Sequence, residues 1–321
     1  MGSKKDYYSD KNVDPFRTFG FRGELSMLSV KESYERLIMR FCEWAKDRED
    51  VRALLVIGSR ARVDHPADAW ADLDLVVVTR KPEFYLSTTD WINALGKPLL
   101  TIIEPTATAD EKERRVLFED MLDVDFAIIP SEKAKELLHA AESPKGIRQM
   151  SNVLGRGTRI LLDKDEVISK LKAAAVTVEK QAPNKPTEQE FQGIVNDFLY
   201  HAVFTAKHLR RGELWWTVLC LNCRLQNLMK TMIEWHSLAK SDGKQDTWFR
   251  GRFLEEWAQP GVTDELRKSF AHYDKEDTQK ALNASITLFT RIANETAQKL
   301  GYHYPTDTEL KIKAWIEKTL R

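Results

Sequence analysis

Short apolar runs and long amphipathic segments divide this chain into two parts. In the first part, runs rich in Val, Ile and Leu are broken by Gly, Pro and charged residues, which predicts the strands of a mixed sheet. These runs occupy residues 51–57, 73–78, 98–103, 115–118 and 124–129, with a further strand and turn at 156–165. Helical spacing of apolar residues predicts helices at 28–47, with Ser29 as the N-cap, at 131–142 and at 165–175.

The second part has helical spacing throughout. The stretch QAPNKP at 181–186 predicts a linker, and beyond it the strand signals disappear. Amphipathic helices are predicted at 187–211, 213–238, 248–258, 263–273, 276–300 and 306–319. The predicted fold class is therefore α+β, with an N-terminal mixed-sheet domain at 28–175 and a C-terminal all-α helical bundle at 186–321.

The charge balance narrows the class of partner. The 321 residues carry 49 Lys and Arg against 49 Asp and Glu, which gives a formal net charge of zero. A nucleic-acid enzyme of this size usually carries a basic face, so we expect a small-molecule acceptor and no nucleic acid. Apolar runs are shorter than the roughly 20 residues that cross a bilayer, so we expect no membrane partner. We also expect a monomer.

Several residues of reactive types have a plainer interpretation. The cysteines are Cys42, Cys220 and Cys223, and an odd number without a secretory signal indicates a reducing, cytoplasmic compartment. The CxxC pair lies on a predicted helix without a second ligand pair, which favours buried thiols over zinc. Tryptophans at helical spacing predict core packing rather than sugar stacking at Trp215, Trp216, Trp235, Trp248 and Trp257. Histidines without metal-ligand spacing are expected either near the surface or at the edge of packed regions, where they cap the packing, at His201, His208 and His236.

Two aspartates on one predicted strand carry the strongest functional signal. The run ADLDLVVV at 71–78 places Asp72 and Asp74 one residue apart, so both face the same side of the sheet with Cα atoms about 7 Å apart. Neighbouring carboxylates repel each other unless a positive charge lies between them. One or two Mg²⁺ ions, which also bind nucleotide phosphates, would supply that charge.

A third carboxylate comes on a later strand. Asp125 alternates with apolar neighbours in MLDVDFAIIP at 121–130, so it converges on the first two if the strands are adjacent. Its chemistry suits either a metal ligand or a general base toward an acceptor hydroxyl. Asp123 has the same parity but lies nearer the turn, and it ranks below Asp125.

A glycine–serine turn follows the strand at 51–57. Backbone N–H groups of such a turn can point at phosphate oxygens. Gly58 permits close approach of the backbone, Ser59 adds a hydroxyl donor, and Arg60 can pair with a phosphate oxygen. Lys207 and Arg211, one turn apart on a predicted helix, are further candidates for the triphosphate, and Arg252 is a third.

The stretch GSRARVDHPADAWADLDLVVV at 58–78 resembles the nucleotide-binding signature of the DNA polymerase beta-like nucleotidyltransferases. More narrowly, IGSRA with DLDLV, LFEDMLDVDFAIIP, AKHLRRGEL and LGYHYP make the chain similar to the aminoglycoside 6-adenylyltransferases (streptomycin adenylyltransferases) from about Leu28 onward. The resemblance implies that 28–175 is a nucleotidyltransferase domain binding ATP and Mg²⁺. It also implies that 186–321 is a helical acceptor-binding domain, with ATP and acceptor held between the two.

The resemblance also implies an activity. AMP is transferred from Mg-ATP to a hydroxyl of a streptomycin-like aminoglycoside, which releases pyrophosphate and inactivates the drug. By motif, Gly58 and Ser59 hold the phosphates, Asp72 and Asp74 bind the metals, and Asp125 matches an acidic position that serves as base in related enzymes. The alternatives are another acceptor (a lincosamide or a protein) and a non-catalytic nucleotide-binding regulator.

A cationic acceptor needs carboxylates in the helical domain as well. Glu188, Glu190 and Asp197 on the first predicted helix of that domain are the candidates. Asp197 has an equally good structural interpretation, an ion pair with Lys207 or Arg210 on the same helix.

Overall fold

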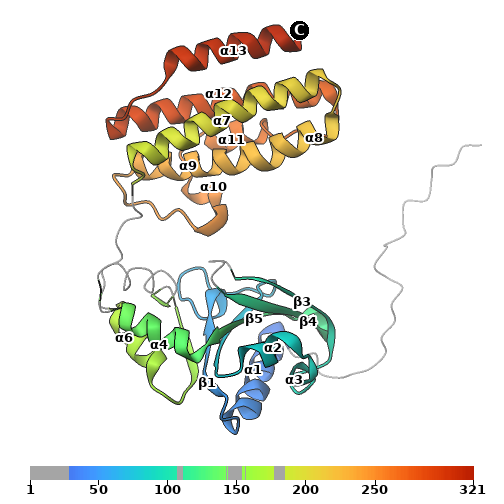
Figure 1. Cartoon of the computed structure of the whole chain (residues 1–321), viewed down its shortest axis with the longest axis vertical. Coiled ribbons are helices and arrows are strands. Elements are labelled where there is room, and N and C mark those ends of the chain that lie inside the picture. Colours follow the sequence, from blue (N-terminus) through green and yellow to red (C-terminus); the bar gives the residue numbers. More distant parts are fainter. Residues whose placement is uncertain (1–28, 107–110, 142, 144–153, 156, 177–184) are drawn as a thin grey trace, which may run out of the picture. The chain divides into compact units, whose positions relative to one another are not determined.

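The computed structural model describes residues 29–106, 111–141, 143, 154–155, 157–176 and 185–321. The chain divides into two compact units, Met1–Glu179 and Lys180–Arg321. The first unit contains a sheet with helices and the second consists of helices (Figure 1). Most of the expected linker, at 181–184, lies outside the described residues, as do positions 28, 142 and 156 at the edges of predicted elements.

Six strands form one mixed sheet in the first unit. Their order across the sheet is β3-β4-β5-β2-β1-β6. The strands are β1 (Val51–Ile57), β2 (Leu73–Thr79), β3 (Pro98–Pro105), β4 (Lys112–Phe118), β5 (Asp123–Pro130) and β6 (Arg159–Asp163). Within the described strands β2 and β5 pair in parallel, while the other neighbours pair antiparallel. The mixed sheet expected from the sequence is confirmed.

One face of the sheet packs against α1 (Val30–Lys46), α2 (Pro82–Ser87) and α3 (Asp90–Asn93). Ser29 caps α1 as predicted, because its side chain accepts from the Glu32 N–H and Glu32 bonds back to Ser29. Phe126 from β5 makes edge-to-face contacts with Phe41 at 5.4 Å and with Trp91 at 5.0 Å between ring centroids. This aromatic core fixes which face of β5 is apolar, and so it directs the alternate residues of β5 to the opposite face.

The opposite face packs in part against α4 (Ser131–Ala140) and α6 (Val167–Val176) (Figure 1). Leu55 from β1 and Val78 from β2 are buried in this second, smaller core. Side chains alternate along a strand, so the residues of β2 that share this face with Val78 are Val76 and Asp74. The acidic residues therefore lie on the same face of the sheet as α4 and α6, at the opposite end of β2 from Val78.

The second unit is a bundle of helices around one core. Phe198 and Phe289 stack at its centre with ring centroids 3.7 Å apart. Its helices are α7 (Glu188–Arg210), α8 (Leu214–Leu219), α9 (Gln226–Lys240), α10 (Leu254–Trp257), α11 (Val262–Arg267), α12 (Lys275–Leu300) and α13 (Thr306–Leu320). A π-helical segment, η3 (Cys220–Leu225), joins α8 to α9, so the helix predicted at 213–238 is continuous but locally widened.

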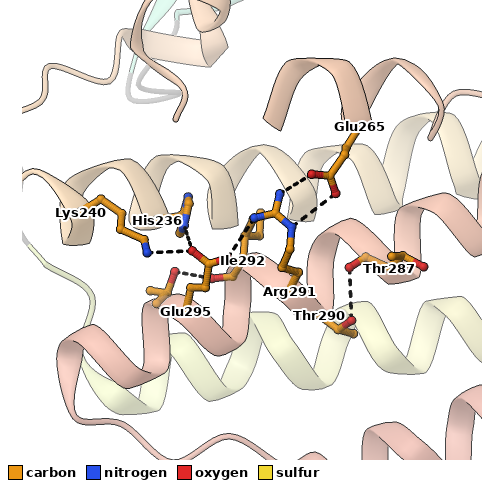
Figure 2. Close-up of polar contacts among 9 residues, drawn as sticks. His236, Lys240, Glu265, Thr287, Thr290, Arg291, Ile292 and Glu295 are labelled. Atoms are coloured by element: carbon orange, nitrogen blue, oxygen red, sulfur yellow. Dashed lines mark hydrogen bonds and ion pairs between the residues drawn. The ribbon is translucent and has the colours of Figure 1, made fainter. Parts of the chain in front are cut away.

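A chain of charged contacts links three helices of this unit (Figure 2). His236 Nε2 lies 3.0 Å from Glu295 Oε2, and Lys240 Nζ lies 2.8 Å from the same oxygen. Arg291 bridges Glu295 at 2.9 Å and Glu265 of α11 at 2.7 Å. The network ties α9 and α11 to α12.

The structure corrects several sequence expectations. The single helix predicted at 248–258 is broken, because Arg250 and Phe253 have positive φ angles of 56° each and leave only η4 (Phe249–Gly251) and α10. The helix predicted at 263–273 ends at Arg267. Helices α2 and α3 were not predicted, since six and four residues are too short to show a period.

Some side chains also differ from expectation. Trp215 and Trp216 are exposed, whereas Trp248 and Trp257 are buried as predicted. Cys220 is buried but Cys223 is exposed, so the prediction of two buried thiols is wrong for Cys223. Of the two places expected for His236, the surface is wrong, because its side chain is buried at 2% exposure. No helix within the described residues is long and apolar enough to cross a membrane.

Candidate active site

Three carboxylates, which we call the acid cluster, meet on one face of the sheet. Asp72 precedes β2, Asp74 is its second residue, and Asp125 is the third residue of β5. Because β2 and β5 pair in parallel with Asp74 opposite Asp125, the two side chains emerge next to each other. One carboxylate oxygen from each of the three residues lies within 4.8 Å of the others. The arrangement depends on the strand order, which places β5 directly beside β2.

Asp125 is the most buried member of the acid cluster, at 8% exposure. Its Oδ2 lies 3.3 Å from Arg115 Nε, whereas its Oδ1 is buried without a hydrogen-bond partner among the described residues. Burial raises the pKa of Asp125 to about 7, Arg115 opposes the rise, and Glu113, Asp74 and Asp123 add to it. A buried oxygen without a donor is costly unless a ligand meets it.

A divalent cation fits the acid cluster. Carboxylate oxygens are the ligands that Mg²⁺ prefers, and the ion usually takes one or two of them together with substrate phosphates. The Oδ1 atom of Asp125 is buried and has no hydrogen-bond partner among the described residues, so a bound cation could supply the missing partner. The residues present therefore suit the metal expected from the sequence, and Asp72, Asp74 and Asp125 could hold it.

The glycine–serine turn lies against the acid cluster. Gly58 begins a single 3₁₀ turn, η1 (Gly58–Arg60), with a φ of 69°, a left-handed conformation that glycine adopts readily. A Cβ atom at this position would lie 2.0 Å from Asp74 Oδ2. Ser59 is 8% exposed, and its Oγ has no hydrogen-bond partner among the described residues. The turn thus carries a buried, unpartnered hydroxyl on the residue that follows the glycine in contact with Asp74.

Arg60 is held by its own surroundings. Its Nε donates to the Asp72 carbonyl at 2.8 Å, and its Nη2 donates to the Ala71 carbonyl. The guanidinium carbon lies 3.6 Å from the centre of the Tyr34 ring, a cation–π contact. Arg60 therefore links the turn to the two residues that precede β2; its expected phosphate contact stays a prediction.

Sequence reasoning missed Arg115, whose Nε lies 3.3 Å from Asp125 Oδ2. It faces Asp125 in the β4–β5 register and also bonds to Glu113 on its own strand and Glu104 on β3. The alternation of charged residues in KERRVLF at 112–118 is the signal that could have indicated a polar face. The sequence alone does not show that this strand neighbours Asp125.

The cationic candidates of the helical unit have local contacts. Lys207 Nζ lies 5.8 Å from the Trp315 ring centre, and Arg211, the C-cap residue of α7, pairs with Glu213 at 2.6 Å. Arg252 accepts a bond at its carbonyl from Trp257 Nε1 at 2.7 Å. Their expected contact with a triphosphate remains a prediction.

The acidic candidates of that unit also have partners. Glu190 completes a capping box with Thr187, and Glu188 accepts from the His303 N–H at 2.8 Å. Asp197 pairs with Arg224 of η3 and with His201 at 2.6 Å. The ion pair of Asp197 was expected with Lys207 or Arg210, and that expectation is wrong, because η3 brings Arg224 to the same face of α7.

A parallel strand pair with clustered acids and an adjoining glycine–serine turn is the arrangement expected of a nucleotidyltransferase. The family model of streptomycin adenylyltransferases matches residues 31–319. The chain belongs to this family and is an adenylyltransferase.

The chain is similar to individual relatives over most of their length. An aminoglycoside 6-adenylyltransferase of Bacillus subtilis (strain 168) is 21% identical over 286 residues, which cover 85% of this chain and 93% of the relative. One from Campylobacter jejuni is 23% identical over 296 residues, covering 90% and 95%. The crystal structure of an aminoglycoside 6-adenyltransferase from Bacillus subtilis covers 91% of this chain and 99% of its own, at 18% identity and a TM-score of 0.42.

Proposed function

We propose that the protein transfers AMP from Mg-ATP to a hydroxyl group of a streptomycin-like aminoglycoside and releases pyrophosphate. The supporting observation is the acid cluster, because three converging carboxylates with a buried unpartnered oxygen suit metal-assisted phosphoryl chemistry. Membership of the streptomycin adenylyltransferase family and similarity to aminoglycoside 6-adenylyltransferases support the aminoglycoside as acceptor.

In this proposal the acceptor oxygen forms a bond to the α-phosphorus of ATP while the bond from that phosphorus to the bridging oxygen breaks. Pyrophosphate leaves, and the hydroxyl proton passes to a base. Asp72, Asp74 and Asp125 would hold Mg²⁺, which neutralises charge on the triphosphate and on the departing pyrophosphate. The Ser59 hydroxyl and the N–H groups of the Gly58–Arg60 turn bind the phosphate oxygens.

Asp125 suits two roles in this scheme. Its pKa of about 7 is near the value that favours a general base at neutral pH. Its place in the acid cluster equally suits a metal ligand. Binding of Mn²⁺ to Asp125→Asn separates the roles: weakened binding with lost turnover assigns a ligand, and unchanged binding with lost turnover assigns a base.

The surroundings of the acid cluster favour a cationic acceptor. Asp123 lies on β5 together with Asp125, Glu113 lies on the neighbouring β4 and Glu104 on β3, and Arg115 of β4 pairs with Glu113, Glu104 and Asp125. An excess of carboxylates attracts the ammonium and guanidinium groups of an aminoglycoside. Lys207 and Arg211 are kept as candidates for the triphosphate, and a cytoplasmic location is part of the proposal because ATP is the donor.

The test is incubation of the full chain with Mg²⁺, ATP and a panel of acceptors. The panel contains streptomycin, other aminoglycosides and a lincosamide, and product masses and released pyrophosphate are measured. We expect an adenylyl adduct on streptomycin or a close analogue, with GTP a poorer donor. An adduct on the lincosamide alone contradicts the aminoglycoside acceptor, and nucleotide binding without transfer to any acceptor contradicts catalysis.

A further inference from the structure

Arg115 stands in direct register with Asp125. In the antiparallel pair of β4 and β5, Arg115 is opposite Asp125, and in the pair of β3 and β4 it is opposite Ile102. Side chains of directly opposed residues lie side by side on one face of a sheet. The backbone alone therefore brings the guanidinium of Arg115 to the edge of the acid cluster.

The guanidinium is held by carboxylates from three strands. Its Nε lies 2.7 Å from Glu104 of β3 and 3.3 Å from Asp125 of β5, and its Nη2 lies 2.8 Å from Glu113 of β4. Glu113 is itself 8% exposed, and its Oε1 also accepts from Arg115 Nε at 3.0 Å. A planar guanidinium bound on several sides has little freedom to turn.

This restraint makes the two oxygens of Asp125 unequal. Oδ2 faces Arg115, while Oδ1 is buried and has no partner among the described residues. The terminal torsion of an aspartate is soft, so an unrestrained carboxylate would rotate and offer either oxygen. Contact with Arg115 leaves Oδ1 as the oxygen available to a ligand.

We infer that Arg115 is a positioning residue, which orients the carboxylate of Asp125 so that Oδ1 serves the reaction at the acid cluster. The ion pairs with Glu113 and Glu104 hold the Arg115 guanidinium in the position from which it contacts Asp125. The inference rests on the proposed function for the site, but it concerns a residue with no role in that proposal. Partners that orient metal ligands typically change affinity or activity by about 10- to 100-fold when removed.

The variants are Arg115→Gln, which removes the charge, and Arg115→Lys, which keeps the charge but loses the planar, forked set of N–H donors. The matched control is Lys97→Gln, which breaks an exposed ion pair with Glu119 at 2.6 Å in the same unit. For each full-length variant, thermal unfolding, the Kd of Mn²⁺ by electron paramagnetic resonance, kcat and the acceptor KM are measured.

We expect kcat of Arg115→Gln to fall about 10- to 100-fold and Mn²⁺ binding to weaken about tenfold, with acceptor KM within about twofold of wild type. Arg115→Lys should recover little, because a point charge does not fix a carboxylate as a planar fork does. The control should match wild type in all measurements.

Two outcomes overturn the inference. One is wild-type kcat and Mn²⁺ affinity in Arg115→Gln; the other is a loss that Lys97→Gln shares or that tracks the folded fraction. The Mn²⁺ measurement needs no acceptor, so it separates this inference from the proposed function. Wild-type protein that binds Mn²⁺ but modifies no aminoglycoside contradicts the acceptor only, while a weakened Mn²⁺ site in Arg115→Gln still supports the positioning role.

Discussion

Gly58 lies directly against Asp74: a Cβ atom on the glycine would stand 2.0 Å from the Oδ2 atom of the aspartate. The closeness follows from the sheet register, which pairs Ile57 at the end of β1 with Asp74 in β2. The turn that would hold phosphates therefore packs directly against the carboxylate that would hold a metal.

The first prediction concerns that contact. Gly58→Ala must move the Asp74 carboxylate or the turn, and it also places a side chain at a φ of 69°. We expect kcat/KM for ATP to fall at least about 100-fold, since displacements near 1 Å have effects of that size. The backbone strain itself should lower the free energy of unfolding by about 1–2 kcal/mol.

Gly301→Ala provides the matched control for Gly58→Ala. Gly301 has a φ of 75°, and a Cβ there would meet nothing within 4 Å, so it carries the backbone penalty without the clash. We expect a similar loss of stability with normal kinetics. If steady-state kinetics show both variants equally active, the contact between Gly58 and Asp74 has no role in turnover.

The second prediction uses Ser59. Its Oγ is buried without a partner among the described residues, so Ser59→Ala breaks no hydrogen bond in the free protein and should not lower the unfolding midpoint in urea. If the hydroxyl binds a phosphate oxygen, KM for ATP should rise about tenfold or more, since a hydrogen bond to a charged group contributes roughly 1.5 kcal/mol. A destabilised variant with unchanged KM contradicts this role.

The third prediction concerns Asp125→Asn, which keeps shape but removes charge. Loss of either a base or a metal ligand should reduce turnover by about 100-fold or more. Hydrogen exchange of β2 and β5 should stay near wild type, because the substitution leaves the strand pairing intact. Turnover within a few-fold of wild type would exclude both roles.

A fourth prediction concerns pH and the helical network in Figure 2. Burial lowers the pKa of His236; Glu295 opposes this effect, and Lys240 and Arg291 reinforce it. With Nε2 bonded to Glu295, a second proton would enter at Nδ1, which is buried without a partner among the described residues. The unfolded chain therefore binds this proton more readily than the folded protein.

The sign follows from that difference. His236 causes no loss of stability above the ordinary histidine pKa, and stability falls as pH drops below about 6.5, by at most about 1.4 kcal/mol per pH unit. His236→Gln should weaken this dependence in urea unfolding between pH 7.5 and 5.5. The control is His272→Gln, which changes a histidine whose side chain is 92% exposed, and the pH dependence of stability should remain in this variant. If the pH dependence is unchanged in His236→Gln, His236 is not its source.

The alternation of side chains along each strand was enough to predict which residues share a face of the sheet, but not which strands are neighbours. Asp72, Asp74 and Asp125 alternate with apolar residues, so their common orientation could be predicted from local sequence. That β5 lies beside β2, and that β4 brings Arg115 to Asp125, depends on pairing between distant segments. The adjacent Arg114 illustrates the limit, because it is buried on the opposite face and donates to the Tyr85 carbonyl at 3.0 Å.

The helical unit shows a similar division. Long amphipathic helices such as α7 and α12 were predictable from their period. The break near Arg250 and Phe253 was not, because it depends on left-handed residues other than glycine. Nor could spacing along α7 reveal the partner of Asp197, since Arg224 comes from the π-helical segment that packs beside it.

The most direct measurement is the rate at which Asp74→Asn forms adenylylated aminoglycoside, followed by mass spectrometry beside wild type at saturating Mg-ATP. Asp74 connects the turn at Gly58 to Asp125, so the account predicts a fall by orders of magnitude at an unchanged unfolding midpoint. Product formation by Asp74→Asn at a rate near that of wild type would contradict it.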